Sequence, residues 1–192
     1  LNAAPLLLGR EHVLSAATGP SKPALNSARR LMPQKNNIIV SLDFDSASRA
    51  LELVECLGPS ASFYKVGLQL LTAEGPALVR KLIAGGKEVF LDLKLHEIPT
   101  SVAGAVAAAG ALGASMVTVH ASAGSAVLRA AVEAARPYPS LSVLALTVIT
   151  SMRDEDLAEL GLTATVPEQV VRLAMLAAAA GTQTESPRSR YL

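Results

Sequence analysis

Short apolar runs alternate with longer segments of helical periodicity through most of this chain. The apolar runs predict strands at residues 38–42, 63–66, 89–93, 116–119 and 143–148. Between them, apolar residues recur at intervals of three and four, which is typical of helices that cover a sheet. The strands begin roughly 25 residues apart with a helix between each pair, and this βαβ repetition predicts a parallel sheet with right-handed crossovers.

Capping residues indicate where the helices begin and end. Ser46 is a suitable N-cap for the first helix, because its side chain can accept a hydrogen bond from an unpaired backbone N–H. Gly75-Pro76 predicts the start of a second helix, and Gly85-Gly86 its end. Alanine-rich segments predict further helices over residues 99–113, 122–135 and 167–180.

Two architectures fit this pattern: an open doubly wound sheet and a (β/α)8 barrel. No G-x-G-x-x-G loop follows the first strand, which weakens a dinucleotide-binding interpretation. Polar residues collect instead after every predicted strand, at Asp43, Lys65, Asp92 and Lys94, His120, and Thr150. A barrel places its chemistry at the carboxyl ends of several strands, so we expect an α/β fold of the (β/α)8 TIM-barrel family.

The length of the chain predicts only part of a barrel. A complete one needs about 200–250 residues, whereas five βα units already extend to Ala180. Residues 182–190 carry no apolar residue where a sixth strand is due. We therefore expect a partial barrel of about five βα units over residues 37–180. Residues 181–192 are expected to form a non-barrel tail, and a frameshifted or mis-spliced end is one explanation for it.

Residues 1–36 are basic and poor in acids, and we expect a disordered leader. An organelle transit peptide and translation from Met32 are the alternatives. The rest of the composition, 51% apolar with a net charge of +1, suits one domain with a sizeable core. Few aromatic residues and the low net charge argue against a nucleic-acid partner, and no apolar run is long enough to span a membrane.

Cys56 is the only cysteine, which excludes an intramolecular disulfide and suits a reducing compartment, so we expect a cytoplasmic protein. Its place in a helical apolar pattern predicts a small core residue.

Asp92 and Lys94 interrupt an apolar run that should form a buried strand. Because side chains alternate along a strand, the two residues should share a face. Burying such charges costs desolvation even when they are paired. A structural ion pair and an exposed edge strand are the alternatives to a functional site. The recurrence of charges at the other strand ends favours the functional interpretation.

Five ordered segments resemble the orotidine 5′-phosphate decarboxylase family over about residues 37–180. They are Ile39-Val40-Ser41-Leu42-Asp43, Tyr64-Lys65-Val66-Gly67, Asp92-Leu93-Lys94-Leu95-His96-Glu97-Ile98-Pro99, Val119-His120-Ala121-Ser122 and Leu146-Thr147-Val148-Ile149-Thr150-Ser151-Met152. The resemblance implies a barrel, usually a homodimer, that converts the nucleotide monophosphate orotidine 5′-phosphate to UMP and carbon dioxide. It implies no metal and no organic cofactor.

The resemblance also implies roles for individual residues. Lys94 gives the proton to the pyrimidine carbon, and Asp92 lies against the departing carboxylate. Lys65 bonds to Asp92 and to the ribose. The remaining residues contact the substrate or the partner subunit's site: Asp43 at the ribose, Thr150 at the pyrimidine ring, and Glu97 and Ser101 across the dimer. Independently, a fixed positive charge where a carbanion develops lowers the barrier to decarboxylation.

The chain departs from the family in two ways. Glu97 stands where the family has Asp, which adds a methylene to an alternating row of lysines and carboxylates. The family's phosphate-binding Gln and Arg lie beyond the position of Ala180, so we expect little activity from this chain alone.

Other functions remain open. They are a related phosphosugar decarboxylase or synthase, some of which use magnesium, an inactive fragment or scaffold, and fusion to a second catalytic domain. The histidines are not at ligand spacing, so His120 is expected to form hydrogen bonds at the rim.

Overall fold

The strands and helices of this chain alternate as the apolar pattern predicts. The computed structural model describes residues 38–184. The strands are β1 (Val40–Ser41), β2 (Phe63–Gly67), β3 (Glu88–Leu95), β4 (Met116–His120), β5 (Ser142–Leu146) and β6 (Gln183–Thr184). The α-helices are α1 (Ala47–Leu57), α2 (Leu68–Ala84), α3 (Pro99–Leu112), α4 (Ser125–Ala135), α5 (Asp154–Glu159) and α6 (Val166–Ala179). Short 3₁₀ turns cover Gly58–Ser60 and Ala121–Ala123.

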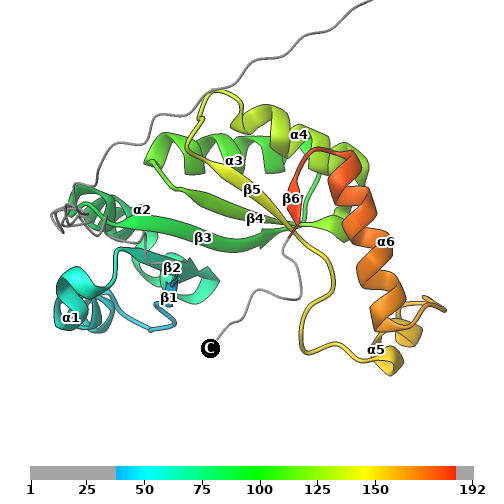
Figure 1. Ribbon diagram of the computed structural model, residues 1–192, viewed down its shortest axis with the longest axis horizontal. Coiled ribbons are helices and arrows are strands. Elements are labelled where there is room, and N and C mark those ends of the chain that lie inside the picture. Colours follow the sequence, from blue (N-terminus) through cyan, green and yellow to red (C-terminus); the bar gives the residue numbers. More distant parts are fainter. Residues whose placement is uncertain (1–37, 185–192) are drawn as a thin grey trace, which may run out of the picture. The chain divides into compact units, whose positions relative to one another are not determined.

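All six strands form one sheet in the order β1-β2-β3-β4-β5-β6, and every neighbouring pair is parallel. Consecutive parallel strands with a helix in each connection are the arrangement of a barrel, whereas a doubly wound sheet reverses its strand order at a switch point. The structure therefore confirms a partial barrel of the (β/α)8 family. Figure 1 shows α3 and α4 lying side by side along β4 and β5.

The core lies between these helices and the strands. The central strands are buried on both faces, as shown by Val89, Phe90 and Leu91 in β3, which are at most 1% exposed. Parallel strands covered by helices read as continuous apolar runs for this reason. The helix α3 ends as the sequence predicts, since Gly113 adopts φ 88° at its C-cap and donates its N–H to Ala109 and Gly110 carbonyls.

The structure corrects several expectations about the elements. Gln183 and Thr184 pair in parallel with Leu144 and Ala145 of β5, so the prediction that no strand follows Gly181 is wrong at these two residues. Their backbone hydrogen bonds do not depend on apolar side chains, which is why the hydrophobic pattern missed them. The helical segment predicted to start at Gly75-Pro76 is present, because Gly75 has a non-helical φ of 65° and divides α2 into two segments at a kink. The structure adds an earlier segment that begins at Leu68. The predicted leader lies outside the described residues.

Cys56 is exposed on α1, so the expectation of a core cysteine is also wrong. The core side of that helix is occupied by Ala50 and Val54 instead. The acidic residues after Arg153 begin the short helix α5, where the Asp156 carboxylate accepts the backbone N–H of Arg153 at 2.7 Å.

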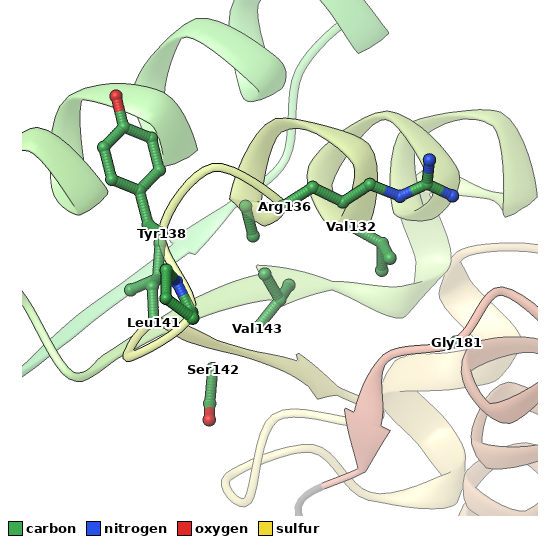
Figure 2. A pocket seen from close by; sticks show the side chains of 9 residues that line it. Val132, Arg136, Tyr138, Leu141, Ser142, Val143 and Gly181 are labelled. Carbon is green, nitrogen blue, oxygen red and sulfur yellow. The ribbon is translucent and has the colours of Figure 1, made fainter.

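A pocket opens at the amino-terminal side of β5, on the opposite end of the strand from the predicted site. Figure 2 shows it between the end of α4, the loop through Tyr138, the start of β5 and Gly181. The Tyr138 ring lies against α3, where a Cβ on Gly110 would come within 2.4 Å of it. In a barrel the amino-terminal face contributes to stability and the carboxyl-terminal face to chemistry.

Candidate functional site

The site begins at an irregularity in β3. Leu91 pairs with Val117 of β4, and the next paired residue of β3 is Leu95, opposite Val119. The segment from Asp92 to Lys94 therefore lies opposite the single residue Thr118. This bulge gives Lys94 a φ of 49°, the one left-handed non-glycine residue in the described part of the chain. Such a conformation costs about 1–3 kcal/mol and is concentrated at functional sites.

The bulge brings the two charges of β3 into direct contact. Lys94 Nζ lies 2.7 Å from Asp92 Oδ1, and Lys65 Nζ of β2 lies 3.6 Å from Asp92 Oδ2. The side chains of Asp92 and Lys65 are each only 14% exposed. A largely buried carboxylate between two ammonium groups is well compensated for the loss of water. The two side chains, which the sequence predicts on one face of the strand, are in direct contact.

Asp43 extends this row after β1. Its Oδ1 lies 3.1 Å from Lys65 Nζ, and its Oδ2 accepts the Ser41 hydroxyl at 2.6 Å. The Ser41 hydrogen bond is the largest cause of a lowered Asp43 pKa; the Lys65 and Lys94 charges add to it, and partial burial opposes it.

Thr118 is a site residue that the sequence reasoning missed. It is fully buried in β4 between Val117 and Val119. Its hydroxyl accepts the Lys94 backbone N–H at 2.8 Å and donates to Asp92 Oδ1 at 3.1 Å. The available signal was a polar residue inside an apolar strand next to the charged strand, because buried hydroxyls require partners.

Two histidines flank the row. The His96 and His120 rings stack with centroids 5.2 Å apart, and the His120 Nδ1 shares a short hydrogen bond with the Ser122 hydroxyl. Burial is the main cause of a lowered His120 pKa, and His96 and Lys94 lower it further. The rim hydrogen bond predicted for His120 is thus present. Among residues 38–184, no group of three or more His, Cys, Asp or Glu side chains is arranged to hold a metal.

The remaining predicted residues lie apart from the row. The Glu97 carboxylate accepts the backbone N–H of Ile98 at 2.8 Å, and within residues 38–184 it forms no ion pair with Lys94. Ser101 is exposed in the first turn of α3. Thr150 is exposed in the turn after β5. The structure therefore unites Asp43, Lys65, Asp92 and Lys94, and places the other three residues at the rim.

Comparison with known proteins identifies the family of this chain. The model of the family described as "Orotidine 5'-phosphate decarboxylase / HUMPS family" matches residues 36–188. The chain belongs to this family. An orotidine 5'-phosphate decarboxylase of Sodalis glossinidius is 45% identical over 165 residues, covering 84% of this chain and 66% of the relative. One from Saccharophagus degradans is 50% identical over 141 residues, covering 73% and 59%.

Solved structures agree with this family assignment. The crystal structure of orotidine 5'-phosphate decarboxylase from Lactobacillus acidophilus superposes with a TM-score of 0.72 and 34% identity, covering 76% of this chain and 68% of that one. A conserved protein of Geobacillus kaustophilus gives a TM-score of 0.71 with 36% identity, covering 75% and 70%. The chain spans 59–66% of the length of the two curated relatives named above. Across the described residues, no helix is both long and apolar enough to cross a membrane.

Proposed function

We propose that this site decarboxylates orotidine 5′-phosphate to UMP, a step of pyrimidine biosynthesis, without a metal or an organic cofactor. The observation that supports this most directly is the Lys94 ammonium, held 2.7 Å from Asp92 at the carboxyl end of β3. The Lys94 side chain is paired but still 36% exposed, which leaves it accessible to a substrate. The location at strand ends of a barrel fits a catalytic role.

The reaction needs a cation and a proton at one place. The bond between the pyrimidine ring and the carboxylate breaks, carbon dioxide leaves, and the electron pair stays on the ring carbon. Lys94 stabilises that negative charge and then donates a proton to the carbon, which balances the reaction without an oxidant or reductant. The Asp92 carboxylate orients Lys94, and its charge disfavours the substrate carboxylate in the ground state relative to the transition state.

The rest of the site would hold the nucleotide. Asp43 and Lys65 are the ribose ligands in this proposal, which their 3.1 Å contact and their position beside Asp92 support. Thr150 would contact the pyrimidine ring. Ser101 and Glu97 would reach a second copy of the chain in a homodimer, which their exposure at the rim allows. We place the phosphate ligands outside residues 38–184, and their binding energy would contribute to the rate of the chemical step.

A magnesium-dependent phosphosugar decarboxylase or synthase is the second candidate, because the description of the matched family model includes HUMPS beside orotidine 5'-phosphate decarboxylase. A cytoplasmic location is part of the proposal and is supported by the presence of a single cysteine. A catalytically inactive scaffold is the third candidate.

The test is an assay of orotidine 5′-phosphate decarboxylation by the purified full chain. Turnover is measured as the release of labelled carbon dioxide, with and without EDTA. We expect slow turnover that EDTA does not change and that Lys94→Ala abolishes. Turnover that requires magnesium would favour the second candidate. If no carbon dioxide is released and UMP does not bind at millimolar concentration, the chain is a scaffold.

A further inference from the structure

We propose that Thr118 is a positioning residue of this site. In this proposal its buried hydroxyl holds the Lys94 backbone in the left-handed conformation and orients the Asp92 carboxylate toward the Lys94 ammonium. Two contacts carry the inference: Lys94 N to Thr118 Oγ1 at 2.8 Å, and Thr118 Oγ1 to Asp92 Oδ1 at 3.1 Å. The consequence for turnover rests on the proposed decarboxylase function, whereas the geometric part is independent of it.

The bulge explains why β3 needs a side-chain partner. Where Asp92, Leu93 and Lys94 lie opposite Thr118 alone, the regular pairing of backbone groups between β3 and β4 is interrupted. A backbone N–H that is left unpaired away from water is costly. The Thr118 hydroxyl supplies the acceptor for the Lys94 N–H, and because Thr118 is fully buried, water cannot easily replace it.

One hydroxyl can serve both neighbours because it has one donor and two acceptor lone pairs. It accepts from the Lys94 backbone and gives its proton to Asp92 Oδ1, the same oxygen that accepts the Lys94 ammonium at 2.7 Å. The Lys94 side chain is thus linked to the Asp92 carboxylate directly, and the Lys94 backbone is linked to it through Thr118. Asp92 Oδ2 stays directed toward Lys65. Thr118 acts through Lys94 and Asp92, so it is a positioning residue.

The geometric test compares amide hydrogen exchange, measured by NMR on the full chain, in four proteins: wild type, Thr118→Val, Thr118→Ser and Thr182→Val. Valine matches the shape of threonine but removes the hydroxyl, so we expect the Lys94 amide to exchange about tenfold faster, relative to the Leu91 amide of the same strand. Serine keeps the hydroxyl and should leave the Lys94 amide protected.

Thr182→Val is the matched control. Thr182 is also a buried threonine, and its hydroxyl donates to the Ala177 carbonyl at 2.9 Å, in the turn between α6 and β6. Loss of the Thr182 hydroxyl should lower the stability of the fold, but this hydroxyl makes its hydrogen bond away from β3. We expect no change in the exchange of Lys94 relative to Leu91. This comparison separates a local effect on Lys94 from a general loss of stability.

The catalytic test measures kcat and KM for orotidine 5′-phosphate in the same proteins. A displaced Lys94 should lower kcat by about tenfold to a hundredfold in Thr118→Val. We expect a KM within about twofold of wild type, because the lost contact acts on the reacting group and not on the binding of the nucleotide. Thr118→Ser should restore most of the rate, and Thr182→Val should keep it.

An unchanged Lys94 amide in Thr118→Val would overturn the proposal, and so would a kcat that falls no more than in Thr182→Val. If Thr118→Val does not fold, Thr118→Ser and Thr118→Ala decide the question, because they differ only in the hydroxyl. Faster exchange in Thr118→Val, with protection in Thr118→Ser but no turnover in any of the proteins, would refute the proposed function of the chain. The role of Thr118 in holding Lys94 would then stand.

Discussion

Lys94 Nζ contacts Asp92 Oδ1 at 2.7 Å although the backbone of Lys94 is left-handed, with φ 49°. In a regular strand, residues two apart share a face, so a left-handed backbone at Lys94 is not needed to put the two side chains on the same side. The fold therefore keeps an unfavourable backbone conformation where a charged pair is formed. A lysine fixed in this way needs little reorganisation when negative charge develops beside it.

Replacing Lys94 by alanine should abolish decarboxylation. The substitution removes both the cation and the proton donor, and loss of a general acid alone costs about 10²–10⁴-fold in rate. Single-turnover release of labelled carbon dioxide measures the effect. Lys81→Ala is the control, because Lys81 is exposed on α2 away from the charged row. Equal rates for the two variants would exclude Lys94 as the proton donor.

Glu97→Asp should increase turnover. The shorter side chain restores the Asp that the family resemblance implies at this position, and a misplacement near 1 Å can cost about a hundredfold in rate. Glu97 in this structure bonds only to the adjacent Ile98 N–H among the contacts of the described residues. The measurement is kcat/KM of both proteins, with Glu52→Asp on the exposed face of α1 as the matched control. If Glu97→Asp does not raise the rate, the longer Glu97 side chain does not weaken the row of lysines and carboxylates.

Gly110→Ala should destabilise the fold. A Cβ at Gly110 would lie 2.4 Å from the Tyr138 ring, too close for any real contact, and overpacking of this kind costs about 1–3 kcal/mol. Urea unfolding gives the free-energy change. Gly104→Ala on the same helix is the control, because a Cβ there meets nothing within 4 Å. We expect it to stabilise α3 by about 0.5–1 kcal/mol. Equal effects at the two glycines would contradict the packing of Tyr138.

His120 should make the fold less stable in mild acid. Its pKa in the folded state is below the usual 6.5, chiefly because of burial. The neutral form is therefore favoured on folding. Its stabilising contribution is complete above pH 6.5 and is lost as the pH falls through the folded-state pKa. The pKa of Asp43 is lowered from 3.8, so its effect on stability falls in a separate range at lower pH.

The free energy of unfolding, measured from pH 8 to pH 5 in wild type and in His120→Gln, tests this prediction. The wild type should lose more stability than the variant over this range, since glutamine does not titrate. Parallel curves would show that His120 has the same pKa in the folded and unfolded states.

Much of the fold could be predicted because the signals are local. The apolar runs at 63–66 and 116–119 lie within β2 and β4, and Pro99 and Gly113 mark the limits of α3. The order of Asp43, Lys65, Asp92 and Lys94 along the chain also placed them at one edge of a parallel sheet, because the carboxyl ends of parallel strands meet there. Periodicity could not identify β6, because its two residues are polar and their pairing with β5 is made by the backbone.

The amino-acid sequence alone therefore determined the alternation of elements, the barrel family and the row of charges, since each depends on neighbours in the chain. Only the tertiary structure decided that β3 bulges, that Lys94 is left-handed and that Thr118 joins it to Asp92. It also placed Cys56 at the surface and Glu97 away from Lys94. The bulge and the contacts of Lys94 depend on distances between groups on different strands, and register across a sheet is not encoded in the spacing along one strand. The exposure of Cys56 depends on which face of α1 packs against the core.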